Sequence, residues 1–322
     1  MEGGAMPISF AGQAIVITGA GGGLGRAYAL EIARRGGKVV VNDLGGATDG
    51  VPGGESSAFA DKVVDEIRAA GGTAVANYDS VASQAGGDAI IACALENFGR
   101  IDAVIANAGT IRYGAFEDLT LDDLNALLAV HVGGSWSVAH AAWPHMKAQG
   151  YGRLVFTTSS GGTLGNASLA AYGAAKGAVM GLMHNLAEAG APHGILCNAM
   201  MPNAMSRMTI DIKPGELGEN RWSAAMPQYF DPAYTAGLAT FLASSACTSH
   251  HGIYSMLGGR LGRAFIGICD GHAQDTPMDA ETIAANWATI NDDQGGYAIP
   301  ANNTDEFRIV AEQRGVTPPA LA

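Results

Sequence analysis

Short runs of apolar and β-branched residues alternate along the chain with longer segments whose apolar residues recur at helical spacing. The runs predict strands near residues 14–19, 39–43, 73–78, 101–107, 152–158, 195–201 and 252–257. The segments between them predict helices near residues 24–35, 56–70, 82–98, 121–148, 168–189 and 231–246. This alternation is typical of β-α-β units. The sequence therefore predicts an α/β fold, a single doubly wound domain whose parallel sheet is covered by helices on both faces.

The pattern changes past residue 265, where the chain becomes more polar. We therefore expect one domain over residues 1–264 and a C-terminal helical extension over residues 265–322. In the extension, TPMDAETIAANWATIND predicts one helix, capped by Thr276 with Asp279 completing a capping box. The apolar residues of this helix fall on one face, which we expect to pack on the core of its own subunit or on a neighbouring subunit.

A glycine-rich turn stands between the first predicted strand and the first predicted helix. The stretch TGAGGGLGRAYALEIARRGGKVVVND contains Gly19, Gly23, Leu24 and Gly25 and ends at Asp43. Glycines at such a turn let the backbone amides of a helix N-terminus approach a phosphate. An acid about 20 residues further on is where a dinucleotide-binding fold places a partner for ribose hydroxyls. The turn is therefore predicted to hold dinucleotide phosphates rather than to act as a hinge.

A second constellation lies further along the chain. Tyr172 and Lys176 are four residues apart on a predicted helix, hence on one face, and Ser159 lies thirteen residues upstream at a strand end. A tyrosine normally loses its proton near pH ~10. A nearby lysine, assisted by a positively charged nicotinamide, would lower that pKa and let Tyr172 remove a hydroxyl proton. Taken alone, the same spacing is more often simple packing with a snorkelling lysine.

A third element shifts that balance, because IDAVIANAG is an apolar strand that ends in the small residues Asn107, Ala108 and Gly109. With TGAGGGLG, Ser159 and YGAAK in this order, the chain resembles the short-chain dehydrogenase/reductase family over residues 10–264. The resemblance implies a Rossmann fold with a seven-stranded parallel sheet and an enzyme that transfers hydride to NAD(H), preferred over NADP(H).

The resemblance also implies a role for individual residues. Tyr172 is the expected catalytic base or acid, Lys176 lowers its pKa and binds the nicotinamide ribose, and Ser159 orients the substrate. Asp43 is the expected NAD selector, because a carboxylate accepts ribose hydroxyls and repels a 2′-phosphate. Further expected cofactor contacts are Asp79 and Ser80 at the adenine, and Asn107, Ala108 and Gly109 beside the adenosine ribose.

One position departs from the wider family, which places an asparagine in the long fourth helix to support a water-mediated proton relay. His131 occupies that position in AVHVGGSW. An imidazole can pass protons at neutral pH, so His131 is a candidate catalytic residue. A lone histidine on a helix is more often a structural group, and the sequence leaves both interpretations open at this position.

Longer runs narrow the resemblance. GLGRAYAL, VVVNDLGG, ANYDSV, AAWPHMK and ETIAANW are similar to the (3R)-hydroxyacyl-CoA dehydrogenase part of the type 2 multifunctional enzymes of peroxisomes, which are also classed as 17β-hydroxysteroid dehydrogenases. This likeness extends to about residue 291. Because no hydratase or sterol-carrier sequence follows, we expect a free-standing dehydrogenase.

The segment after the sixth strand is expected to form a lid over the nicotinamide end of the cofactor, where Met205, Arg207 and Met208 would contact substrate. Such a wall suits a bulky apolar substrate, either a (3R)-3-hydroxyacyl-CoA or a hydroxysteroid. Only five lysines occur in the chain, which weakens the case for the phosphates of coenzyme A, although arginines are available. A third alternative is an NAD-binding regulator that has lost turnover.

Composition excludes other classes of function. The net charge of −12 argues against binding nucleic acid or an anionic membrane. Four widely spaced cysteines and the absence of ligand-spaced histidines predict no metal site and no disulfide framework, which fits the cytoplasm. The family resemblance adds the expectation of a homodimer or homotetramer built across the fourth and fifth helices.

Overall fold

The predicted strands assemble into one sheet in the computed structural model, which describes residues 7–46, 57–204 and 227–317. Within these residues the sheet has eight strands in the order β3-β2-β1-β4-β5-β6-β7-β8. They are β1 (Ala14–Thr18), β2 (Lys38–Asn42), β3 (Thr73–Asn77), β4 (Ala103–Ala106), β5 (Gly152–Thr157), β6 (Ile195–Pro202), β7 (Gly252–Leu257) and β8 (Arg260–Ala264). Neighbours from β3 to β7 pair in parallel, which confirms the α/β fold.

The eighth strand corrects the expected number of seven. Gly258 and Gly259 form a two-residue connection between β7 and β8, and both have positive φ, at 59° and 77°. Such a turn is typical of a hairpin, because its twist matches that of the flanking strands. The sequence RLGRA of β8 is short, charged and exposed, so it lacks the apolar run that marks the other strands.

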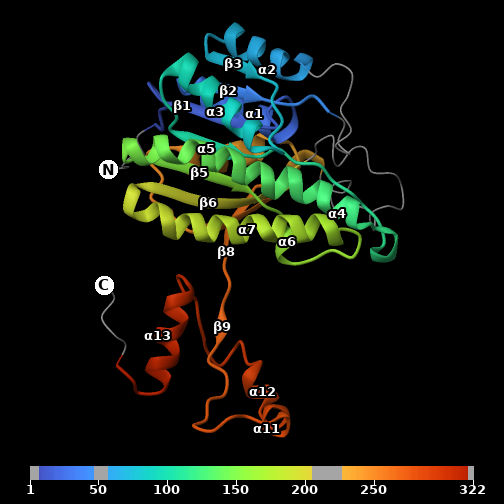
Figure 1. Ribbon diagram of the computed structural model, residues 1–322, viewed down its shortest axis with the longest axis vertical. Helices are drawn as coiled ribbons and strands as arrows, with labels where there is room; N and C mark the ends of the chain where they lie inside the picture. The colour runs from blue at the N-terminus through green and yellow to red at the C-terminus, as the bar shows by residue number, and fades with distance from the viewer. Residues whose placement is uncertain (1–6, 47–56, 205–226, 318–322) are drawn as a thin grey trace. The chain divides into compact units, whose positions relative to one another are not determined.

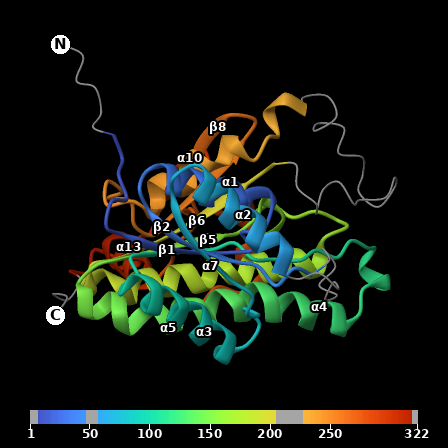
Figure 2. The same cartoon turned by 90° about the horizontal axis from the view of Figure 1, so that it is seen from above.

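Helices cover both faces of the sheet. They are α1 (Gly23–Arg34), α2 (Ser57–Ala69), α3 (Gln84–Phe98), α4 (Leu121–Leu128), α5 (Gly134–Gln149), α6 (Ser160–Thr163), α7 (Ala170–Gly190) and α10 (Ala233–Ala243). Figure 1 shows α5 and α7 in front of the sheet, and Figure 2 shows α1, α2 and α10 on one face and α3, α5 and α7 on the other. The core between α1, α2, α10 and the sheet is fully buried and apolar, and includes Ile15, Ile17, Tyr28, Ile32, Val39 and Val41.

The long fourth helix is interrupted, so the predicted continuous helix over 121–148 is wrong at its centre. After α4 the backbone forms a π-helical turn, η2 (Ala129–Gly133), before α5 begins. A π turn accommodates one extra residue per turn and frequently marks a functional position. His131 lies in this turn.

The chain divides into two compact units, residues 1–263 and 264–322. In the second unit, β9 (Ile268–Cys269) and β10 (Tyr297–Ala298) form an antiparallel pair, accompanied by α11 (Ala280–Ala285), α12 (Trp287–Ile290) and α13 (Asn303–Gln313). The predicted single helix is therefore two helices separated by Asn286, and α13 was not expected. Asp279 caps α11 by accepting a hydrogen bond from the Thr282 amide, a role predicted for Thr276.

The apolar side chains of the second unit stay accessible. Over residues 264–317 no side chain is buried, and large hydrophobic groups are exposed, among them Ile283, Trp287 and Phe307. Within the described parts of both units, no helix has the length and apolar character needed to cross a bilayer.

Candidate active site

A pocket opens where the parallel strands end. It is lined by residues that follow β1, β2, β3, β4 and β5, together with residues of η2 and α7. The strand order reverses between β1 and β4, and ligands of doubly wound sheets bind at such a switch point. Of the residues predicted from the sequence, the pocket is lined by Gly19, Gly23, Leu24, Asp43, Asp79, Ser80, Asn107, Ala108, Gly109, His131, Tyr172 and Lys176.

The glycine turn is packed too tightly for side chains. A Cβ atom on Gly19, which has a φ of 63°, would lie 2.8 Å from the Ala108 Cα, and one on Gly25 would lie 2.3 Å from the Gly19 carbonyl oxygen. Gly25 does not line the pocket, so its part is to let α1 pack on the turn. Gly22 caps α1 without a side-chain hydrogen bond, which leaves the first-turn amides of α1 for an anionic group.

Asn107 ties the end of β4 to this turn. Its side-chain amide donates to the carbonyl oxygens of Thr18 at 3.0 Å and Gly19 at 3.2 Å. The backbone amides of Asn107 and Ala108 both donate to the Thr18 hydroxyl oxygen at 3.0 Å. Asn107 therefore fixes the shape of the turn in addition to lining the pocket.

Asp43 lies at the end of β2 and is buried. One of its carboxylate oxygens accepts a hydrogen bond from the Gly21 amide and the other from the Gly45 amide, both at 2.8 Å. The carboxylate thus anchors the glycine turn and the loop that follows β2. Each carboxylate oxygen can accept more than one hydrogen bond, so Asp43 retains capacity for a ligand hydroxyl.

Ser159, Tyr172 and Lys176 come together at the other end of the pocket. The Lys176 ammonium donates to the Thr157 carbonyl oxygen at 2.7 Å and lies 5.7 Å from the centre of the Tyr172 ring. Ser159 hydrogen-bonds Tyr172, and its hydroxyl oxygen accepts from the Gly161 amide at 3.1 Å. Ser159 contacts Tyr172 without lining the pocket itself.

Burial controls the charges of this group. It lowers the pKa of Lys176, which is only 4% exposed, from 10.5 to about 7. Burial also raises the pKa of Tyr172, and the hydrogen bond with Ser159 opposes part of that rise. In the protein alone Tyr172 is therefore a neutral phenol. The phenolate expected from the sequence requires an additional positive charge in the pocket.

His131 lies next to Tyr172, with ring centroids 5.4 Å apart in an edge-to-face arrangement. Its Nε2 atom is 2.7 Å from the Thr110 carbonyl oxygen and so carries the proton that it donates there. A Cβ on Gly109 would lie 2.4 Å from the imidazole, which explains the glycine. Burial, with a smaller effect of Lys176, lowers the pKa of His131 well below its usual value. At neutral pH this imidazole is therefore uncharged.

The remaining predicted site residues, Met205, Arg207 and Met208, lie outside the described residues. The described part of the chain contains no group of three or more His, Cys, Asp or Glu side chains that could hold a metal ion. Sequence reasoning missed other lining residues. Asn42, Thr157, Thr158 and Pro202 stand at strand ends, a position that could have identified them, whereas Val81, Thr110 and Val130 carry no comparable signal.

Residues 13–215 match the short chain dehydrogenase family. The chain belongs to this family. Two relatives extend the likeness beyond the matched segment. A protein of Mycobacterium tuberculosis named as a short-chain type dehydrogenase/reductase is 44% identical over 88% of this chain and 95% of its own length. Peroxisomal multifunctional enzyme type 2 of Mus musculus is 42% identical over 89% of this chain, which spans only 38% of that enzyme.

Solved structures match the same fold. Full-length peroxisomal multifunctional enzyme type 2 of Drosophila melanogaster matches with a TM-score of 0.75 and 28% identity, over 95% of this chain and 50% of that one. A 7α-hydroxysteroid dehydrogenase in complex with NADH and 7-oxo glycochenodeoxycholic acid matches with a TM-score of 0.68 and 25% identity, over 78% and 95% of the two chains. The protein is an oxidoreductase that acts on CH–OH groups.

The buried Lys176 makes stability depend on pH. Between pH 7 and 10.5 the unfolded chain binds a proton at Lys176 that the folded chain does not, so this residue makes stability rise with pH by up to ~1.4 kcal/mol per unit. As the pH falls below 7, the cost of burying the ammonium approaches its full value. We expect Lys176→Met to stabilise the protein most at pH 6.5 and progressively less towards pH 9, measured by urea unfolding without cofactor.

Lys147→Met provides the matched control, because Lys147 is exposed on α5. Because this replacement removes no buried ammonium, the stabilisation that declines from pH 6.5 to pH 9 is expected in Lys176→Met and not in Lys147→Met. An equal pH dependence in the two variants would contradict the depressed pKa of Lys176.

Proposed function

We propose that this protein is an NAD-dependent dehydrogenase that interconverts a secondary alcohol and a ketone on a bulky apolar substrate, with (3R)-3-hydroxyacyl-CoA as that substrate. The observation that carries the proposal is the meeting of Ser159, Tyr172 and Lys176 at one end of a pocket whose other end holds Asp43. The 42% identity to peroxisomal multifunctional enzyme type 2 supports the acyl-CoA substrate.

The residues of the pocket fit a dinucleotide. The turn at Gly19 and Gly25 leaves no room for a Cβ, and the uncapped first turn of α1 presents amides to a pyrophosphate. Asp43 would accept the hydroxyls of the adenosine ribose and repel a 2′-phosphate. When bound, the nicotinamide supplies the acceptor for the hydride and a positive charge.

The chain's own residues handle the proton and the substrate oxygen. Ser159 would donate a hydrogen bond to that oxygen, and Tyr172 would take the hydroxyl proton. Lys176 keeps two of its three ammonium donors after binding the Thr157 carbonyl, and these are available to the nicotinamide ribose. Lys176, beside the positive charge that the nicotinamide would supply, would offset the effect of burial on the pKa of Tyr172, and this would couple formation of the base to cofactor binding.

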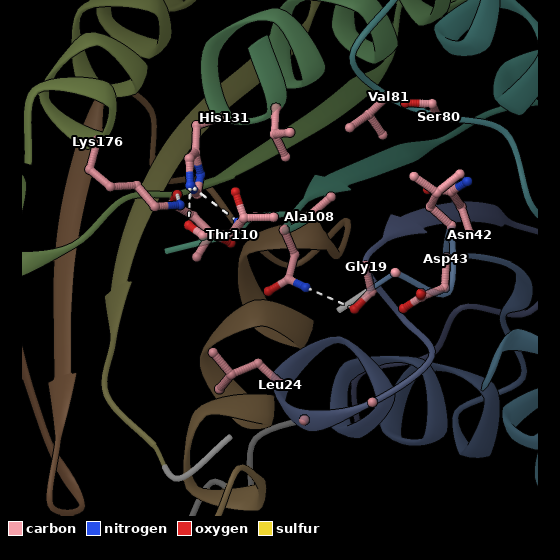
Figure 3. A pocket seen from close by; sticks show the side chains of 18 of the residues that line it. Gly19, Leu24, Asn42, Asp43, Ser80, Val81, Ala108, Thr110, His131 and Lys176 are labelled. Atoms are coloured by element: carbon pink, nitrogen blue, oxygen red, sulfur yellow. Dashed lines mark hydrogen bonds between the residues drawn. The ribbon is translucent and has the colours of Figure 1, made fainter. Parts of the chain in front are cut away.

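His131 is proposed to support this proton transfer as a neutral acceptor. Its Nε2 proton is committed to Thr110, so its buried Nδ1 atom, which has no partner among the described residues, offers only a lone pair. Figure 3 shows the imidazole and the Lys176 ammonium directed to the same part of the pocket. Because its pKa is lowered, His131 is not expected to carry a proton as an imidazolium. Its lone pair instead favours a role in holding a water molecule beside Lys176.

Features outside the pocket complete the proposal. We propose that Met205, Arg207 and Met208 form the substrate lid, and that the chain forms a homodimer or homotetramer. The exposed apolar groups of the second unit then pack on the core or on a neighbouring subunit, because leaving Trp287 and Phe307 in water is unfavourable. The four free cysteines fit a reducing compartment such as the cytoplasm.

A hydroxysteroid is the second candidate substrate. The structural likeness to a 7α-hydroxysteroid dehydrogenase and the low lysine count favour it. We would incubate the purified protein with NAD and, separately, a (3R)-3-hydroxyacyl-CoA, its (3S) enantiomer and estradiol, and follow NADH absorbance. We expect NADH with the (3R) thioester only. Production of NADH with estradiol alone would identify a steroid, and not the thioester, as the substrate. Cofactor binding without turnover of any substrate would indicate a regulator.

Tyr172→Phe tests the proposed base. The variant keeps the ring but lacks the hydroxyl, so we expect turnover at least ~10²-fold slower with unchanged NADH affinity, because general acid–base catalysis is lost. Tyr234→Phe, at an exposed position on α10, is the control and should behave as wild type. Comparable turnover in both variants would rule out Tyr172 as the base.

Asp43→Ala tests the cofactor preference. We expect NADH affinity to fall at least ~10-fold, because charge-assisted hydrogen bonds to the ribose are lost, and NADPH affinity to fall less. Asp65→Ala, on the exposed side of α2, removes the same charge outside the pocket and should change neither affinity. An unchanged ratio of the two affinities in Asp43→Ala would remove Asp43 from the proposed role.

A further inference from the structure

The end of β5 is fastened to the middle of α7 by two hydrogen bonds that run in opposite directions. The Thr158 hydroxyl donates to the Lys176 carbonyl oxygen at 2.8 Å, and the Lys176 ammonium donates to the Thr157 carbonyl oxygen at 2.7 Å. All three residues are buried, and Thr158 is only 1% exposed. Thr157, Thr158 and Lys176 therefore form a clamp between β5 and α7.

The chemistry of Thr158 commits it to this clamp. A hydroxyl group has one proton, and the proton of Thr158 is used on Lys176. Although Thr158 lines the pocket, it therefore has no donor left for a ligand. The Lys176 carbonyl can accept this bond in addition to one from its own helix, because a carbonyl oxygen has two lone pairs. The Thr158 hydroxyl thus holds two backbone segments together.

A second contact brings the same part of the chain onto α7. Figure 1 shows α6 beside α7, and the two helices pack on each other. A Cβ on Gly162 would lie 2.8 Å from the backbone carbonyl carbon of Lys176 and 2.7 Å from the Gly177 amide nitrogen. The glycine therefore lets the chain lie directly on the helix backbone. Thr158 and Gly162, which flank Ser159 in the sequence, thus contact one position of α7.

The group between these two contacts is the one that meets Tyr172. The Ser159 hydroxyl oxygen accepts from the Gly161 amide at 3.1 Å, and Ser159 hydrogen-bonds Tyr172. This bond opposes part of the rise that burial causes in the pKa of Tyr172. Tyr172 lies one helical turn before Lys176 on α7. The separation of the Ser159 and Tyr172 hydroxyl groups therefore depends on how closely the end of β5 approaches α7 at Lys176.

We propose that Thr158 is a positioning residue, which holds the Ser159 hydroxyl against Tyr172 by bonding the helix that carries Tyr172. The inference rests on the proposed function, in which Ser159 and Tyr172 act together on the substrate hydroxyl. A methyl group in place of the Thr158 hydroxyl would approach the carbonyl oxygen no closer than about 3.3 Å. The contact of 2.8 Å would then open by ~0.5 Å, and Ser159, the next residue, would move away from α7 with it.

Titration of Tyr172 in the full chain tests the proposal. The absorbance of tyrosinate is followed as the pH rises, without and with NAD. Each protein is compared with the same protein carrying Tyr172→Phe, so that the difference reports Tyr172 alone. Thr158→Val keeps the size of the side chain but lacks the hydroxyl. We expect the pKa of Tyr172 to rise by ~0.5–1 pH unit, the effect of one lost hydrogen bond. Thr158→Ser keeps the hydroxyl and should restore the wild-type value.

Thr240→Val is the matched control. Thr240 is 2% exposed on α10, and its hydroxyl oxygen has no partner among the described residues. The replacement makes the same chemical change in the core without the loss of a hydrogen bond, so the titration of Tyr172 should be unchanged. Urea unfolding of both valine variants separates the shift of Tyr172 from a loss of stability, which a purely structural threonine would also cause.

Gly162→Ala disturbs the same approach from the other side of Ser159. The added Cβ would meet backbone atoms of α7, which cannot turn aside as a side chain can, so α6 must shift away from α7. We expect the pKa of Tyr172 to rise in this variant as well. Gly181→Ala is its control, because a Cβ on Gly181, also on α7, would have no atom within 4 Å.

The outcomes are distinct. An unchanged pKa of Tyr172 in Thr158→Val, an equal rise in Thr240→Val, or no recovery in Thr158→Ser would each overturn the proposal. If Tyr172 does not ionise before the protein unfolds, crystal structures of the wild type and Thr158→Val decide. A Ser159–Tyr172 separation that widens by ~0.5 Å supports the proposal, and an unchanged separation overturns it.

Failure of the proposed function would give a different result. No alcohol substrate enters the titration, so a wrong substrate assignment leaves its result intact. If NAD left the titration of Tyr172 in the wild type unchanged, the proposed coupling of the base to the cofactor would be wrong. The difference between the wild type and Thr158→Val would still test the role of Thr158.

Discussion

The close approach of the glycine turn to the end of β4 is the constraint on which the site depends. Gly25 lets α1 pack against the Gly19 carbonyl, and Asn107 bonds to the same turn from the neighbouring strand. Asp43 closes the arrangement from the other side by binding the Gly21 amide. Three strand ends thus converge on one backbone segment, and the shape of the pocket follows from that segment rather than from any single lining side chain.

Much of the fold could be predicted because burial leaves a direct pattern in the sequence. Strands covered on both faces are continuous apolar runs, and the helices between them keep one apolar face. The prediction of secondary structure failed where an element does not show the apolar pattern typical of a buried strand or a regular helix. The π turn at His131 does not alter which residues are apolar, and β8 is an exposed strand whose position is set by the turn at Gly258 and Gly259. In the second unit the first helix begins at Ala280, after Pro277 and Met278, so Asp279 and not the expected Thr276 is its N-cap.

The site was predictable where spacing within one element decides proximity, as for Tyr172 and Lys176, one helical turn apart. Properties of the site that depend on burial could not be predicted from the sequence. The neutral state of His131 and the raised pKa of Tyr172 arise from the surroundings of these groups, which lie on other elements. The contact between Asn42, which lines the pocket, and Asn77 was not predictable, because the two residues lie on different strands and only the register of the sheet makes them neighbours.

The burial of Lys176 has a consequence for the energetics of ligand capture. Because burial lowers the pKa of Lys176 to about 7, the uncharged amine is accessible at this position in a neutral solution. A ligand that requires the ammonium form draws molecules with the uncharged amine into that form and removes protons from the buffer as it binds. Association of such a ligand is then a protonation event as well as a docking event, and its heat includes the ionisation heat of the surrounding buffer.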